Sequence, residues 1–137
     1  MSGIVIKDTV NPALKKLISQ LQDPKEFLVE LGKAERTEVE LRFRNEEDPD
    51  SKTWKPSFRA LKEGGQTLTD TSFLRNSFEF VVQNNSLFVG TPVAYSQSHQ
   101  TGIDIVTGRP LPVRKILGIN ENTMKNARAI FKELMGV

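Results

Sequence analysis

Residues 94–102, AYSQSHQTG, concentrate the polar side chains of this sequence that are able to do chemistry. They include the only tyrosine and the only histidine of the chain, Tyr95 and His99. An imidazole titrates near neutral pH, so His99 is a candidate general base. Ser96 and Ser98 lie near it in the sequence, and Asp104 is the nearest acid. The alternative is that these groups form the polar face of a structural segment.

The patterns that would make this segment catalytic are missing. No Gly-x-Ser-x-Gly nucleophile elbow surrounds either serine. One histidine and no cysteine are too few for a zinc site, which usually takes three or four protein ligands. Gly64-Gly65 lacks the Gly-Lys-Ser/Thr that completes a phosphate-binding loop. We therefore expect a protein that is not an enzyme and has no catalytic, metal or cofactor site, with His99 in a structural or interface role.

The acidic run before the single tryptophan has two readings. Asp48 and Asp50 resemble half of a calcium-binding loop, but the spaced oxygen ligands and the closing glutamate of an EF-hand are missing. We interpret 48–57, DPDSKTWKPS, as a plain turn. Trp54 within it is an anchor either of the core or of an interface, and we prefer the core.

Length and composition predict one soluble domain spanning 1–137. The apolar fraction of 37% is lean, which suggests flat or extended parts, or a surface that partner subunits complete. A net charge of +2 says little about nucleic acid by itself. No apolar run approaches the roughly 20 residues that cross a bilayer, and the first ten residues lack the layout of a secretory signal. We expect no membrane association, and assembly in a cytosol.

Hydrophobic periodicity predicts helices at both ends of the chain. The ranges 11–22 and 25–47 each follow an Asn-Pro or Asp-Pro start signal and should form a helical hairpin. Gly32 is either a break in the second helix or a point of close packing. A closing helix over 120–137 has Asn120 as its N-cap.

The middle of the chain predicts a small sheet. Alternating apolar residues in 77–91, interrupted by Asn84-Asn85, favour a tight β-hairpin. The segment 107–119 should be a loop feeding a short or edge strand, and 58–72 includes a short helical piece. The order indicates an α+β fold, with the small antiparallel sheet packed against the helical hairpin and the C-terminal helix.

Motifs in residues 48–119 resemble the phage virion morphogenesis family, the tail completion proteins of Mu-like phages. The chain shares with that family, in order, an acidic turn before Trp-x-Pro, a Leu-x-Asp-Thr stretch, a Val-Gly-Thr leading to a His-Gln-x-Gly, and a Pro-x-Arg followed by Leu-Gly. The matching residues are Trp54, Pro56, Leu68, Asp70, Thr71, Leu74, Ser77, Val89, Gly90, Thr91, Tyr95, His99, Gln100, Gly102, Pro112, Arg114, Leu117 and Gly118. Ser72, Ser96 and Ile116 depart from it, where the family has Gly, Ala and an aromatic residue.

The resemblance implies a structural role for the opening segment. AYSQSHQTG looks like a short helix that ends at Gly102, with Tyr95 partly buried. His99 and Gln100 would then hold the following loop or face a neighbouring subunit. The loops 101–115 and 45–57 should project and carry contacts, with Arg109 and Arg114 as charged anchors and a fold that survives Arg114→Glu.

The resemblance also implies a function in the virion, in the tail or neck, after assembly in the bacterial cytoplasm. Such a protein completes the tail or joins it to the head by binding other tail or neck proteins. A closed homo-oligomeric ring is expected, a hexamer by analogy with tail proteins. The alternatives are a connector on the capsid side and a DNA-binding phage protein. The second is less favoured because basic residues are sparse in the C-terminal part of the chain, 109–137.

Overall fold

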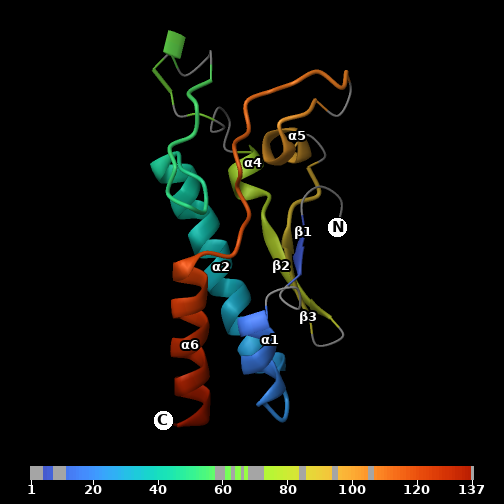
Figure 1. Cartoon of the computed structure of the whole chain (residues 1–137), viewed down its shortest axis with the longest axis vertical. Helices are drawn as coiled ribbons and strands as arrows, with labels where there is room; N and C mark the ends of the chain where they lie inside the picture. Colours follow the sequence, from blue (N-terminus) through green and yellow to red (C-terminus); the bar gives the residue numbers. More distant parts are fainter. Residues whose placement is uncertain are drawn as a thin grey trace.

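The computed structural model describes residues 5–7, 12–57, 61–62, 64–65, 67, 73–83, 86–93, 96–104 and 107–136. In chain order, the elements are β1 (Val5–Lys7), α1 (Pro12–Ser19), α2 (Lys25–Asn45), α4 (Phe73–Asn76), β2 (Glu79–Gln83), β3 (Ser86–Gly90), α5 (Ser96–Thr101) and α6 (Glu121–Met135). Figure 1 shows an elongated molecule in which α2 runs beside α6 on one side and the sheet lies on the other. The expected α+β class is confirmed.

Three helices begin at residues whose local conformation or hydrogen bonding favours a helix start. Helix α1 starts at Pro12, whose fixed φ suits a first helical position. The Asp23 carboxylate accepts the N–H of Lys25 at the start of α2 (3.1 Å). Asn120 and Thr123 form a reciprocal capping box at the start of α6, as the sequence predicts for the cap. None of the described helices has the length and apolar content needed to cross a membrane.

The described strands form one antiparallel sheet in the order β1-β3-β2. Gln83 pairs with Ser86, so two residues join β2 to β3 and the expected hairpin is confirmed. The third strand differs from the expectation: β1 pairs with β3, and 111–120 has no regular structure. Two prolines, Pro110 and Pro112, limit the N–H donors of 107–119, whereas Val5–Lys7 can pair.

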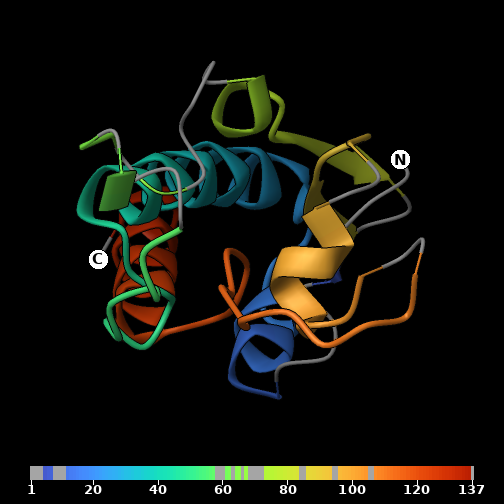
Figure 2. The same cartoon turned by 90° about the horizontal axis from the view of Figure 1, so that it is seen from above.

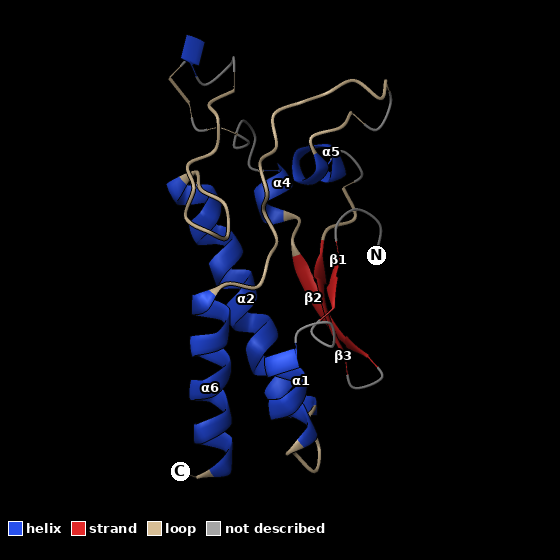
Figure 3. Cartoon of the chain, in the orientation of Figure 1, coloured by secondary structure: helices blue, strands red, loops and turns tan. Residues whose placement is uncertain are grey.

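The core lies between α2 and the sheet. Phe27, Phe43, Val39 and Ile116 are fully buried, and Phe43 packs edge-on against Trp54 with ring centroids 5.4 Å apart. Both α1 and α6 also contact the core, while α5 lies at the far end of the sheet (Figures 2 and 3). The stretch leading into α6 runs between α5 and α6 in the view of Figure 2 and descends toward the start of α6 in Figure 1.

Candidate interaction site

Residues 114–118, here called the central segment, cross the core without forming a helix or a strand. Buried backbone groups need partners, so side chains from elsewhere must supply them. Gln100, in α5, does this most fully. Its Oε1 accepts the N–H groups of Ile116 (2.8 Å) and Leu117 (3.2 Å), and its Nε2 donates to the Leu117 carbonyl (2.8 Å). One side chain thus replaces the ladder that a neighbouring strand would provide.

Two further side chains bond the central segment from the opposite side. Arg42, in α2, donates through Nη1 to the Ile116 carbonyl (2.7 Å) and through Nη2 to the Gly118 carbonyl (3.3 Å). Trp54 donates its indole N–H to the Lys115 carbonyl (2.9 Å) and is 3% exposed, so it is the core anchor that we preferred. We call Arg42, Trp54 and Gln100 the clasp.

Arg114 corrects the expectation of an exposed charged anchor. Its side chain is 8% exposed, and its Nε donates to the Lys55 carbonyl (2.7 Å). Its backbone N–H donates to the His99 carbonyl (2.7 Å). A glutamate at 114 would place a carboxylate beside that carbonyl, so a fold unaffected by Arg114→Glu is no longer expected. Arg109 is exposed, as expected.

His99 lies in α5 in surroundings that disfavour a charged imidazole. Burial, and secondly the cationic Arg114, lower the pKa of His99 from its usual range. The hydroxyl of the neighbouring Ser96 is buried and donates to the Val93 carbonyl (2.7 Å). This serine therefore stabilises the start of α5 instead of serving as a nucleophile. The helix ends at Gly102 with φ +76°, the C-terminal glycine that the resemblance implies.

The separated sequence motifs meet in space around the clasp. Gly118 packs against Pro49, and a Cβ added at 118 would lie 2.8 Å from the proline Cγ. Ser77 and Thr91, from the second and third motifs, share a hydrogen bond of 2.6 Å between their hydroxyls. Leu74, in α4, is buried in the core. Asp70 and Tyr95 lie outside the described residues.

The segment from 102 to 113, here called the arm, projects from the clasp (Figure 1). Its two sides are tied together by backbone hydrogen bonds from Leu111 to Gly102 (2.8 Å) and from Asp104 to Arg109 (2.9 Å). Near the tip, the Asp104 carboxylate accepts the Thr107 N–H (3.0 Å). The described part of the arm is therefore a folded hairpin, not an open loop.

Apolar side chains of the arm face solvent. Ile103 is 54% exposed, Val113 is 53% exposed and Leu111 is 38% exposed. At its base, Gly102 leaves no room for a side chain, because a Cβ there would lie 2.5 Å from Val113 Cγ2. A cluster of exposed apolar residues on a fixed support is typical of a protein-binding surface.

The second loop that we expected to project, 45–57, folds back on the molecule. Glu47 pairs with Thr53, and Asp48 Oδ1 accepts the N–H groups of Asp50 (2.8 Å) and Lys52 (2.9 Å). This carboxylate closes a turn, which agrees with the plain-turn reading. Within the described part of the chain, no three His, Cys, Asp or Glu residues gather as metal ligands would.

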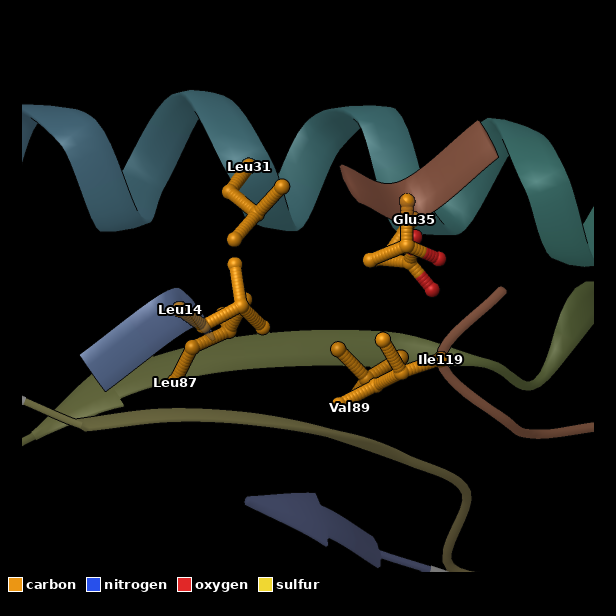
Figure 4. A pocket seen from close by; sticks show the side chains of 7 residues that line it. Leu14, Leu31, Glu35, Leu87, Val89 and Ile119 are labelled. Carbon is orange, nitrogen blue, oxygen red and sulfur yellow. The ribbon is translucent and has the colours of Figure 1, made fainter. Parts of the chain in front are cut away.

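Sequence reasoning missed an ionisable pair inside the core. Glu35 and Arg42 are 5% and 4% exposed, and their Oε2 and Nη2 atoms are 3.9 Å apart. Burial raises the pKa of Glu35, against the opposing effects of Thr123 and Arg42. Glu35 also lines a cavity of about 10 Å³, which is close to the size of one water. Figure 4 shows the side chains around this cavity. The lining residues are Leu14, Leu31, Glu35, Leu87, Val89, Ile119 and Thr123. Glu35 and Arg42 are seven residues apart, which places both on one face of α2, and this spacing was the signal in the sequence that could have predicted the pair.

Comparison with known proteins identifies the family of the chain. The sequence profile of the phage virion morphogenesis family matches residues 6–135. The chain belongs to that family, and the suspected resemblance is confirmed. It is thus a phage virion assembly protein. No curated protein and no solved structure matches the chain.

Proposed function

We propose that this chain completes the phage tail, or joins the tail to the head, by binding neighbouring virion proteins through the arm. The family supports the assembly role, and the exposed Ile103, Leu111 and Val113 on the arm are the observation that carries the binding role. Catalysis is not part of the proposal, because Ser96 is committed to the fold and His99 lies beside a cation.

The arm is suited to binding because it is already ordered. Its backbone ladder and the Arg114 anchor at its base hold the apolar side chains in place before a partner arrives. A surface that is ordered in advance loses less conformational entropy on association, so more of the interface energy remains as affinity. The clasp contributes to this order, because it holds the central segment, from which the arm extends, against the core.

A closed ring is the arrangement that we propose for the assembled state. Contacts between two different surfaces of one subunit extend without limit unless the rotation between subunits closes them. A ring at the tail end would present one face to the tail and end its growth. Six copies are proposed by analogy with tail proteins, and the partners proposed are tail or neck proteins.

The test is to delete the gene from the phage or prophage that carries it and to image the lysate by negative-stain electron microscopy. We expect unjoined heads and tails, or tails of abnormal length. The gene supplied in trans should restore normal particles, and a gene for an Arg114→Glu protein should restore fewer because that protein folds poorly.

The images also separate the alternatives. Abnormal tail ends indicate action at the tail, whereas complete tails beside heads without a neck indicate a connector on the capsid side. Normal infectious particles from the deletion strain would contradict the proposed function in both forms.

A further inference from the structure

We propose that a pocket between α2 and α4 binds one carboxylate group, supplied by an acidic side chain of a neighbouring protein subunit. The pocket has a volume of about 210 Å³ and is separate from the arm and the clasp. It is lined by Arg36, Val39, Glu40, Arg75, Asn76 and Phe78.

The floor of the pocket is apolar and fixed. Val39 and Phe78 are 0% and 2% exposed, and Phe78 packs against Phe43 with ring centroids 5.9 Å apart. A floor held in the core cannot move aside, so the pocket keeps its shape. Because both side chains are almost inaccessible, a ligand would contact mainly the polar groups of the rim.

The rim of the pocket carries two guanidinium groups that the described chain leaves unused. Arg36 is exposed on α2, and Arg75 is half-buried on α4. Within the described part of the chain, the ion pairs are Lys33–Glu30 and Arg42–Glu35, so neither rim arginine has a carboxylate partner. Arginine is the side chain best suited to bind a carboxylate at an interface, because its planar donors match both oxygens.

Glu40 sets the charge of the ligand that the pocket favours. It lies one turn after Arg36 on α2, and a basic residue before an acidic one is the weaker orientation for a helical ion pair. Two guanidinium groups and one carboxylate leave a net charge of +1 in the pocket. That charge balances one carboxylate, whereas Glu40 would repel a phosphate carrying more negative charge. The pocket therefore favours an acidic protein side chain over nucleic acid.

Binding of a carboxylate by this pocket is independent of the proposed function, and only the source of the carboxylate rests on it. The direct test uses the whole purified chain with its arginine side chains labelled for NMR. Acetate and inorganic phosphate are each added at constant ionic strength, so that screening does not change. We expect acetate to shift the Nε–H signals of Arg36 and Arg75 saturably, while the exposed Arg128 on α6 stays unchanged.

Variants sharpen the test. Arg75→Gln should weaken acetate binding about tenfold, as loss of one charged hydrogen-bond donor pair predicts, and Arg128→Gln should leave it unchanged. Glu40→Gln should strengthen phosphate binding by removing the repulsion. Among the described residues, no side-chain hydrogen bond or ion pair ties either rim arginine to the fold, so circular dichroism should show no change in these variants. Tighter binding of phosphate than acetate by the wild-type chain, or equal shifts at all arginines, would overturn the proposal.

The source of the carboxylate is then found with Arg75→Glu and its control Arg128→Glu. If the acid comes from a second copy, sedimentation velocity will show that only Arg75→Glu reduces self-association. If the acid comes from another virion protein, self-association stays the same and only Arg75→Glu particles lose the protein. Assembly unaffected by Arg75→Glu, together with intact acetate binding in wild type, would overturn the subunit source alone. Because acetate binding needs no virion, a failure of the proposed function is distinguishable from a failure of this site.

Discussion

At the scale of single residues, Gln100 shows how a polar side chain supports a segment that lacks regular structure. Three hydrogen bonds from one amide satisfy the buried backbone of Ile116 and Leu117. A buried N–H or C=O without a partner costs about 1–3 kcal/mol. The Gln100 side chain therefore contributes more to the free energy of unfolding than a polar residue on the surface would.

We expect Gln100→Ala to lower the free energy of unfolding by about 2–4 kcal/mol, because it leaves those backbone groups without the amide. Urea denaturation followed by circular dichroism measures the change. Gln22→Ala, at an exposed position in the loop before α2, is the control and should be close to neutral. Equal effects of the two changes would show that the clasp adds nothing to stability.

His99 should make stability depend on pH. Its pKa is lowered in the folded protein, so the unfolded chain binds a proton first as the pH falls below about 6.5. The free energy of unfolding should therefore fall on acidification from that point, through the folded pKa. We expect His99→Gln to flatten this part of the curve in denaturation series between about pH 8 and 5. Glu35, whose raised pKa acts in the opposite direction, is present in both proteins and cancels from the difference. Parallel curves for the two proteins would disprove this.

At the scale of elements, the contact of α2 with the sheet depends on Gly32. Our reading of the sequence left open a helix break or a close-packing point, and the structure shows the second. A Cβ at 32 would lie 2.4 Å from Phe80 Cδ2, within β2. The helix continues through this residue without interruption.

Gly32→Ala should destabilise the protein by about 1–3 kcal/mol through overpacking, although alanine is the better helix former by about 1 kcal/mol. Thermal and urea unfolding check the sign. Lys33→Ala, exposed on the same turn, controls for helix propensity and should change stability little. A stabilising Gly32→Ala would mean that Phe80 moves aside freely.

At the scale of the whole molecule, the core, the clasp and the arm form a continuous chain of contacts. Helix α2 contacts both the sheet and α6, and Arg42 ties it to the central segment. Arg114, at the base of the arm, is bonded to the Lys55 carbonyl. The described part of the arm is thereby connected to the core, and it extends outward beside α5 (Figure 2).

Ile103→Asp is expected to leave the fold intact and to reduce incorporation of the protein into particles at least about tenfold, since a charge in an apolar contact is unfavourable. Western blotting of purified particles, beside circular dichroism of the pure protein, measures both. The control is Leu61→Asp, which changes an apolar residue of 73% exposure away from the arm. Normal incorporation of the Ile103→Asp protein would remove the arm from the contact surface.

The sequence alone determined the features that depend on near neighbours. The start of α1 at Pro12, the cap at Asn120, the apolar stripes of the helices and the pairing of β2 with β3 follow from local conformational preference. The motif resemblance determined the family, because four motifs in order are specific where one is not. These predictions needed no knowledge of which segments meet.

Only the tertiary structure decided the features that depend on distant partners. Val5–Lys7 forms the third strand of the sheet. Arg114 is buried and donates to the Lys55 carbonyl, and Arg42 donates to carbonyls of the central segment. The sequence of a three-residue strand does not show whether the strand pairs with another. The identity of an arginine does not show whether its side chain is buried or exposed. Their environment is set by the segments that pack against them, and that packing is a property of the whole fold.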